Sequence, residues 1–131
     1  MRESPEELLT QAKEAVSNCY CPYSGFRVTA VIEDADGGLH WGVNVENSSY
    51  GLTICAERAA VFKAVSHGQK KFTGILIYSP DGDPLPCGAC RQVLAEFCDD
   101  DFPVVLATPH SIRHFTLAEL LPNPFKPEFA T

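Results

Sequence analysis

The sequence has few basic residues and no apolar run long enough to span a membrane. It contains 10 Lys and Arg residues against 17 Asp and Glu residues, which gives a formal net charge of -7. The sequence therefore lacks the basic stripe that binds phosphate backbones or anionic lipids. Residues 1–7 have none of the apolar character of a secretory signal. We expect a cytoplasmic protein that binds neither nucleic acid nor membranes.

Internal repeats, linkers and low-complexity stretches are also absent from the sequence. The chain has 131 residues, of which 45% are hydrophobic, and this suits one compact domain with a substantial core. We expect residues 1–131 to fold as a single unit.

Hydrophobic spacing and turn residues predict an alternation of helices and strands. The predicted helices begin after a capping Ser at residue 4, span residues 54–67 and 87–97, and begin again after a capping box at residues 116–119. The predicted strands span residues 27–33, 39–45, 74–79 and 103–107, and the first two form a hairpin. Residues 80–86 are rich in Pro, Asp and Gly and predict a loop. This order is typical of an α/β domain in which helices cross over a mixed sheet.

Six cysteines are present, and Cys87 and Cys90 form a Cys-x-x-Cys pair. In a reducing compartment such cysteines are metal ligands or buried thiols more often than disulfides. The pair can chelate a zinc ion, and the distant Cys55 can supply a third ligand, which leaves the fourth corner of a tetrahedral site for water. Both cysteine motifs open a predicted helix at the edge of the sheet, where the helix dipole favours thiolates.

Two other interpretations of these cysteines are a structural zinc site and a redox-active pair. A structural zinc site needs a fourth thiolate, but Cys98 follows Cys90 by eight residues, about 12 Å along a continuous helix. Two sulfurs that share one zinc ion must each lie about 2.3 Å from it. A redox-active pair would leave Cys55 and the nearby Glu57 without a role. The cysteines outside the site are interpreted as small apolar side chains: Cys19, Cys21 and Cys98.

Glu57 follows Cys55 by two residues, which makes it a candidate for proton transfer. A water molecule bound to zinc ionises near neutral pH, and a neighbouring carboxylate can carry its proton elsewhere. A Glu in the first turn of a helix also stabilises the helix dipole, so its presence alone is not diagnostic. On a continuous helix Glu57 points about 200° away from Cys55, and it can share the site only if the metal lies off the helix end.

Five short motifs, in this order, resemble those of the small cytidine deaminases over nearly the whole chain. They are residues 21–24 with Phe26, residues 44–47, residues 55–57, residues 87–92 and residues 120–122. The Cys-Ala-Glu and Pro-Cys-x-x-Cys elements are the established signature of zinc deaminases, in which three cysteines are an accepted ligand set. The sequence departs from the family after Phe26, where Arg-Val-Thr-Ala at residues 27–30 replaces a frequent Pro-Val-Gly-Ala.

The resemblance implies the fold and the catalytic group. The fold is a three-layer, cytidine-deaminase-like arrangement with helices on both faces of a mixed sheet. Zn²⁺ is held by Cys55, Cys87 and Cys90. Glu57 is the catalytic residue, which moves a proton to N3 of cytosine and then to the departing amine. Arg58 matches the family residue that hydrogen-bonds the ligand sulfurs and withdraws charge from them.

The resemblance also implies the substrate contacts. Phe26 matches the ring that stacks on the pyrimidine, and Ala56 matches a backbone donor to the base. Asn44 and Glu46 match ligands of the ribose hydroxyls, and this pair favours an ordinary ribose.

Small members of this family are homotetramers in which neighbouring subunits complete each site. Tyr50 and Phe125 match the residues that are lent across the interface. A homotetramer is therefore expected from the resemblance.

The implied function is zinc-dependent hydrolytic deamination of cytidine and 2'-deoxycytidine to uridine and 2'-deoxyuridine, with release of ammonia, in pyrimidine salvage. The acidic charge favours a free nucleoside over a polynucleotide as the substrate. One alternative is a deaminase of a modified cytosine nucleoside or of a nucleoside antibiotic such as blasticidin S. Another is a zinc-binding or redox protein without catalytic activity.

Overall fold

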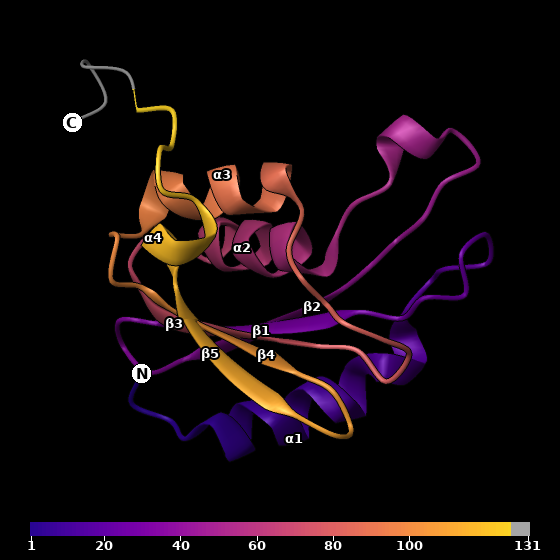
Figure 1. The fold of residues 1–131 in the computed structure, drawn as a ribbon, viewed down its shortest axis with the longest axis horizontal. Helices are drawn as coiled ribbons and strands as arrows, with labels where there is room; N and C mark the ends of the chain where they lie inside the picture. Colours follow the sequence, from indigo (N-terminus) through magenta and orange to yellow (C-terminus); the bar gives the residue numbers. More distant parts are fainter. Residues whose placement is uncertain (127–131) are drawn as a thin grey trace.

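The computed structural model describes residues 1–126 and has the α/β architecture that the sequence predicts (Figure 1). The strands are β1 (Thr29–Asp34), β2 (Leu39–Val43), β3 (Phe72–Tyr78), β4 (Pro103–Ala107) and β5 (Ile112–Thr116). The α-helices are α1 (Pro5–Ala15), α2 (Ala56–Ser66), α3 (Gly88–Phe97) and α4 (Leu117–Leu120). Short 3₁₀ turns form at η1 (Val16–Asn18) and η2 (Tyr50–Leu52).

The five strands form one mixed sheet in the order β2-β1-β3-β4-β5. Strand β1 is antiparallel to both β2 and β3, so β2 and β3 run in the same direction on either side of it. Strands β3 and β4 are parallel, and β5 is antiparallel to β4. Thr29 at the start of β1 lies opposite both Val43 and Tyr78, the last residues of β2 and β3. The carboxyl ends of β2 and β3 and the amino end of β1 therefore meet at one edge of the sheet.

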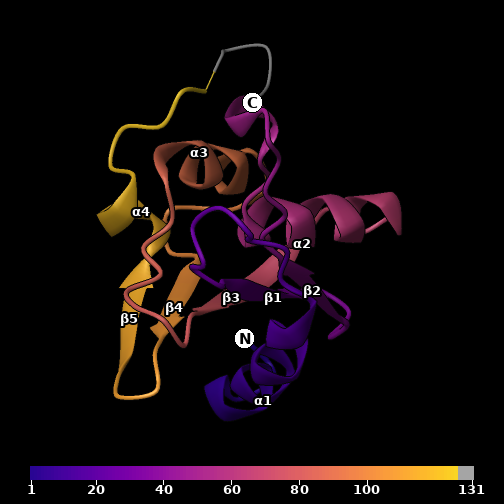
Figure 2. The ribbon, with the colours of Figure 1, turned by 90° about the vertical axis from the view of Figure 1, so that its right-hand side faces the viewer.

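Helices cover both faces of this sheet, which confirms the predicted three layers (Figure 2). Helix α1 lies on one face, and α2, α3 and α4 lie on the other. Successive side chains of a strand point to opposite faces. In β3, Ile75 and Ile77 accordingly pack in the core under α2 and α3, whereas Leu76 packs against Leu8 and Ala12 of α1.

The helix starts follow their predicted caps. The side chain of Ser4 accepts a hydrogen bond from the Glu7 amide, with Pro5 at the first helical position. Thr116 and Glu119 form the predicted capping box at α4. The two central helices begin later than predicted, because Cys55 and Cys87 are the N-cap residues of α2 and α3.

Strand β5 was not predicted from the sequence. It lies at the edge of the sheet, and its first three residues are exposed, so its sequence lacks the regular apolar alternation of a half-buried strand. The segment before Cys55 also differs from the prediction. Ile54, predicted as the first residue of a helix, instead forms an isolated antiparallel bridge with Val45.

Residues 44–55, between β2 and α2, project from the body of the domain, drawn from purple to magenta in Figure 1. Among residues 1–126, no helix combines the length and the apolar character needed to cross a membrane.

Candidate active site

The two cysteine motifs meet at the edge of the sheet where β2 and β3 end. Cys55 and Cys87 both have extended backbone at the N-cap, and their carbonyls accept the first helical hydrogen bonds, from the amides of Ala59 and Arg91. Cys90 lies in the first turn of α3. Two helix amino termini therefore point at one place, and their partial positive charge favours thiolates there.

The three sulfurs are spaced as a tetrahedral metal site requires. The Sγ atoms of Cys55 and Cys87 are 3.9 Å apart, those of Cys87 and Cys90 are 3.4 Å apart, and all three lie within 4.8 Å of one another. Sulfurs bound to one zinc ion at about 2.3 Å are separated by about 3.8 Å. Among residues 1–126, these are the only three Cys, His, Asp or Glu side chains grouped in this way. The donor set therefore fits zinc.

Cys98 lies away from this cluster. It follows the last residue of α3 and is buried in the core among apolar side chains. Burial raises the pKa of its thiol to about 12, as expected for a thiol that packs rather than ligates. The interpretation as an apolar side chain is therefore confirmed for Cys98. Cys19 is half-buried and its thiol donates to the Val28 carbonyl at 3.4 Å.

Arg58 lies against the sulfurs. Its Nη2 donates to Cys55 Sγ at 3.4 Å. A hydrogen bond with Cys90 and the interaction with Arg58 together outweigh burial, and they lower the pKa of the Cys55 thiol to about 5. The guanidinium thus supports a thiolate at Cys55.

Glu57 lies in the first turn of α2 and is only 4% exposed. Burial, as the largest cause, raises the pKa of its carboxyl to about 7. Because Cys55 is the N-cap and not a helical residue, its thiol lies off the helix end. Glu57 and the thiols of Cys55 and Cys87 consequently line the same pocket.

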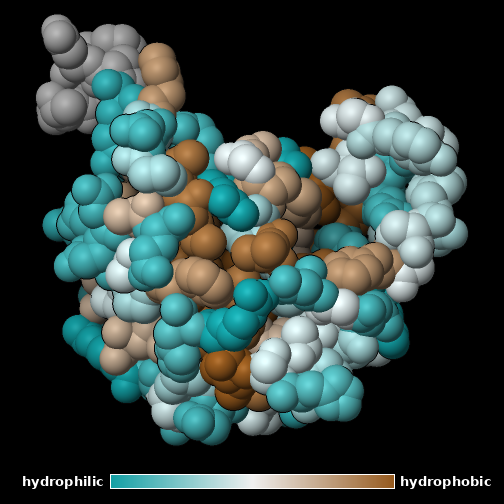
Figure 3. Space-filling model, in the orientation of Figure 1, coloured by the Kyte–Doolittle hydropathy of each residue, from teal (hydrophilic) through white to brown (hydrophobic). Residues whose placement is uncertain are grey.

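This pocket brings together most of the side chains predicted from the sequence. Figure 3 shows apolar residues in the hollow between the projecting segment and the rest of the domain. The predicted residues that line the pocket are Phe26, Asn44, Cys55, Ala56, Glu57 and Cys87. The residues that were not predicted are Val28, Thr53, Asp83, Pro84 and Leu85. The only sequence signal for the last three is their place directly before Pro86 and Cys87.

Asn44 uses both ends of its amide to hold the backbone of the segment that leads into β1. Its Nδ2 donates to the Phe26 carbonyl at 2.7 Å, and its Oδ1 accepts from the Val28 amide at 3.2 Å. Asn44 is buried and fixes the residues on both sides of position 27. In this chain it therefore shapes the pocket wall as well as lining it.

Glu46 lies in an adjoining hollow lined also by Tyr23, Ser24, Tyr50 and Thr53. Its carboxylate accepts hydrogen bonds from the amides of Tyr23 and Ser24 and from the Ser24 hydroxyl. The Ser24 hydroxyl is the largest cause of a lowered pKa for Glu46. Thr53 lines both hollows, so the two lie side by side.

Tyr50 and Phe125 do not enter the main pocket of their own chain. Each is 74% exposed. Tyr50 packs edge-on against Tyr23, with ring centroids 5.7 Å apart, and the backbone of Phe125 pairs with the side chain of Gln92. Both rings therefore remain free to contact another molecule.

Arg91, next to the second cysteine pair, supports the loop that carries Cys87. Its Nε donates to the Pro86 carbonyl at 2.8 Å and its Nη1 to the Leu120 carbonyl at 2.6 Å. The sequence alone gave no role to this side chain. Its contacts fix the residue before Cys87 and tie α3 to α4.

Comparisons with known proteins point to one family. Residues 2–106 match the protein family described as the cytidine and deoxycytidylate deaminase zinc-binding region. A cytidine deaminase from Sporosarcina psychrophila is 45% identical over 125 residues, which are 94% of this chain and 92% of that protein. A probable cytidine deaminase from Dictyostelium discoideum is 46% identical, over 97% of this chain and 87% of its own.

A solved structure has the same fold. The crystal structure of a cytidine deaminase from Burkholderia pseudomallei superposes with a TM-score of 0.88 at 39% identity, and covers 94% of this chain and 100% of its own.

Proposed function

The chain belongs to the cytidine and deoxycytidylate deaminase family, and we propose from this that it hydrolyses cytidine and 2'-deoxycytidine to uridine and 2'-deoxyuridine with release of ammonia. The observation that carries the proposal is the shared pocket. Three thiols at zinc spacing and a buried carboxyl lie beside an aromatic ring and a free helix amino terminus. In the reaction the C4–N4 bond of cytosine breaks and a C4–O bond forms with oxygen from water.

Cys55, Cys87 and Cys90 are the proposed zinc ligands. Their donor chemistry and spacing fit this ion, and Arg58 offsets part of the charge of three thiolates. When bound there, zinc supplies a water molecule that ionises near neutral pH.

Glu57 is the proposed proton carrier. It accepts a proton on one side of the pocket, delivers it to N3 of cytosine, and then helps to protonate the departing amine. A carboxyl whose pKa is raised by burial can both accept and donate a proton near neutral pH, which this double role requires.

The remaining pocket residues are proposed to orient the nucleoside. Phe26 stacks on the pyrimidine, and the Ala56 amide at the start of α2 donates to the base. Asn44 and Glu46 contact the ribose. Because Glu46 lines the adjoining hollow and not the main pocket, the sugar is expected to extend toward Thr53.

We place the reaction in pyrimidine salvage in the cytoplasm, carried out by a homotetramer. Support for the oligomer comes from the exposed aromatic rings of Tyr50 and Phe125, which match residues that one subunit lends to its neighbour. The exposed apolar residues on and beside the projecting segment are Tyr20, Tyr23, Val45 and Leu52. Large exposed apolar residues grouped in this way are typical of interfaces.

Ammonia release from cytosine, cytidine, deoxycytidine and blasticidin S tests the function. Release from the two ordinary nucleosides is expected. Release from cytosine alone would contradict the ribose contacts, and release from blasticidin S alone would favour an antibiotic deaminase, such as the Bacillus cereus blasticidin-S deaminase that is 30% identical over 125 residues. No release from any substrate would leave a silent metal-binding protein.

The same panel should be run on Glu57→Gln with the zinc content measured. We expect full zinc, because the side chain is not a ligand, and a fall in kcat of about 10³-fold, the size of a lost general acid and base. Zinc loss in parallel with activity would mean that Glu57 holds the metal.

A further inference from the structure

The loop of residues 80–86 forms one wall of the pocket without belonging to any helix or strand. Asp83, Pro84 and Leu85 line the pocket, and Leu85 is 49% exposed. The loop then leads directly into Cys87. A wall of this kind needs an anchor outside its own backbone if it is to hold a ligand in one place.

Arg27 and Asp81 provide such an anchor. The Asp81 carboxylate accepts three hydrogen bonds from Arg27: from Nε at 3.0 Å, from Nη2 at 2.8 Å, and from the backbone amide at 2.9 Å. These bonds lower the pKa of Asp81 to about 2. A forked guanidinium contact reinforced by a backbone donor fixes both the orientation of the Asp81 carboxylate and its distance from Arg27.

The anchor is continuous with the ring that faces the base. Gly82 lies against Phe26, since a Cβ built on Gly82 would fall 2.8 Å from Phe26 Cε2. On the other side, Asn44 holds the backbone of Phe26 and Val28, the two neighbours of Arg27. The contacts therefore join residues 26–28, which lead into β1, to residues 80–82 at the start of the loop.

We propose that Arg27 is a positioning residue of the deaminase site, which locks the loop of residues 80–86 against Phe26 and thereby sets the affinity for the cytosine nucleoside without touching it. The inference rests on the proposed function. It concerns the position at which the sequence departs from the frequent Pro-Val-Gly-Ala pattern. A Pro at residue 27 would have neither the amide hydrogen nor the guanidinium that Asp81 binds.

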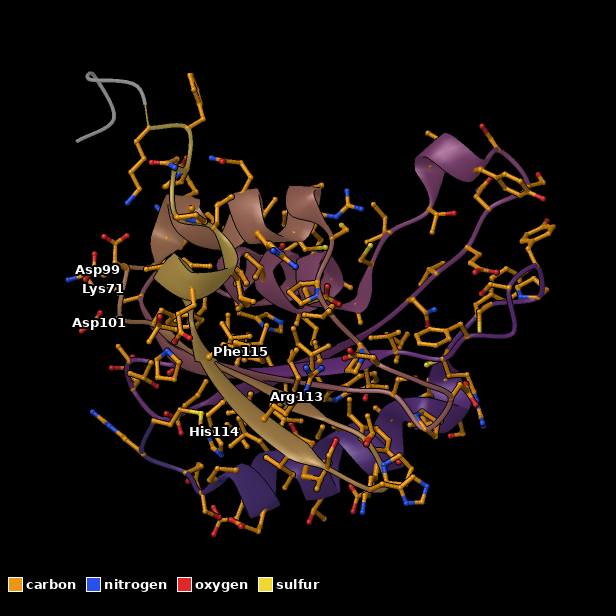
Figure 4. All side chains as sticks on the ribbon, viewed as in Figure 1. Lys71, Asp99, Asp101, Arg113, His114 and Phe115 are labelled. Carbon is orange, nitrogen blue, oxygen red and sulfur yellow. The ribbon has the colours of Figure 1, made fainter. Side chains whose placement is uncertain are left out.

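A second ion pair on the same loop serves as a matched comparison. Arg113 lies on the edge strand β5 (Figure 4), and its Nη2 donates a single hydrogen bond to Asp83 Oδ1. The side chains are 43% and 50% exposed, and no backbone donor joins them. A single exposed pair of this type contributes little. Arg113→Gln therefore removes one positive charge beside the loop, from strand β5, without removing the anchor.

The deciding experiment measures equilibrium binding of cytidine in the Glu57→Gln background, where turnover is stopped, together with KM and kcat in the active enzyme. Arg27→Ala is expected to raise both Kd and KM about tenfold, with kcat changed by less than about threefold. Arg27→Lys keeps the positive charge but not the forked guanidinium, so its Kd and KM should lie between those of the parent and those of Arg27→Ala. Arg113→Gln should stay within about twofold of its parent.

Two further readouts separate positioning from a loss of fold. Asp81→Ala should raise Kd at least as much as Arg27→Ala, because it also removes the acceptor of the Arg27 backbone amide, and the double variant should be no worse than Asp81→Ala alone. In the unmutated enzyme KM should rise at about 1 M NaCl, because salt weakens the attraction between solvent-exposed charges such as Arg27 and Asp81, whereas KM of Arg27→Ala should not respond. This salt test needs only folded, unmutated protein if a variant proves unstable.

The inference is overturned if Arg27→Ala binds cytidine as tightly as its parent, if only kcat falls, or if Arg113→Gln has an equal effect. An unmutated enzyme whose KM ignores salt also overturns it. Each of these outcomes counts against the inference only in an enzyme that releases ammonia from cytidine. An enzyme that neither binds nor deaminates cytidine contradicts the proposed function itself, and this inference falls with it.

Discussion

Arg58 shows how one side chain can adjust the charge of the whole cluster. Three thiolates and one Zn²⁺ carry a net charge of about -1, and this charge opposes the ionisation of water. The guanidinium lies 3.4 Å from Cys55 Sγ through Nη2, while its buried Nε has no hydrogen-bond partner among residues 1–126. Its positive charge is therefore directed mainly at the sulfurs of Cys55 and Cys90.

We predict that Arg58→Ala keeps most of its zinc but loses about 10- to 100-fold in kcat, the usual cost of removing such a partner of a metal ligand. The midpoint of its pH–rate profile should move upward, because water ionises less readily beside an uncompensated negative cluster. Metal analysis and kcat between acidic and alkaline pH check this. Arg58→Lys, which keeps the charge, is the control, and an unchanged midpoint in Arg58→Ala would contradict the role.

Asp34 supports the hairpin between β1 and β2 and makes stability depend on pH. Its side chain is buried, and its carboxylate accepts hydrogen bonds from His40 Nε2 at 2.7 Å and from the amides of Asp36 and Gly38. Burial raises the pKa of Asp34, but the bonds from His40, Gly38 and Asp36 outweigh it and lower the pKa below the ordinary value.

The sign of the pH effect follows from this lowered pKa. Stability from Asp34 is fully present above the unfolded-state pKa of about 4, and it is lost as the pH falls from there through the lower folded-state value. Asp34→Asn should have a lower melting temperature at neutral pH and a shallower decline below about pH 4. Thermal unfolding over this range measures both. Asp36→Asn, at an exposed neighbour, is the control, and parallel pH curves for Asp34→Asn and its parent would refute the prediction.

At the scale of elements, the position of α2 depends on one small residue of β2. A Cβ on Gly42 would lie 2.6 Å from the Ala56 carbonyl oxygen and 2.5 Å from the Ala60 amide nitrogen. Helix α2 therefore rests directly on the strand, and Ala56 stands between Cys55 and Glu57. The distance between β2 and α2 sets where both of these side chains lie.

We predict that Gly42→Ala pushes α2 away from the sheet, costs about 1–3 kcal/mol of folding free energy through overpacking, and weakens zinc binding. Chemical denaturation and zinc titration measure the two effects. Gly51→Ala is the control for stability, because no atom lies within 4 Å of a Cβ at that position. A Gly42→Ala protein with unchanged stability and zinc affinity would show that α2 is not held by this contact.

Elements differ in how far their sequence determines them. Helix α1 and the capping box of α4 were predictable because their caps and apolar faces are local properties. Strand β5 was not, because an exposed edge strand is specified by its pairing with β4 and not by its own pattern. The pairing of Arg27 with Asp81 is likewise invisible in the sequence, since 54 residues separate the two side chains.

At the scale of the whole molecule, the strand order explains why distant motifs share one pocket. The spacing of Cys87 and Cys90 predicts a local chelate, but the place of Cys55 follows only from the return of β3 to the far side of β1. The grouping of Cys55, Cys87 and Cys90 beside Glu57 was predictable from the resemblance. Thr53 and Asp83 were not, because they reach the pocket through loops whose course depends on the assembled fold.

The assembly of several chains gives the last prediction. If Tyr50 completes the site of a neighbouring subunit, each site takes Glu57 from one subunit and Tyr50 from another. Tyr50→Ala and Glu57→Gln then remove residues that different subunits contribute to the same site. Co-expression of the two inactive variants should then restore about one quarter of the normal activity, because a random mixture pairs an intact Glu57 with an intact neighbouring Tyr50 at about one site in four. Ammonia release from the purified hybrid, with sedimentation to confirm four chains, measures this. Activity no greater than the sum of the separately made variants would place Tyr50 outside the shared site.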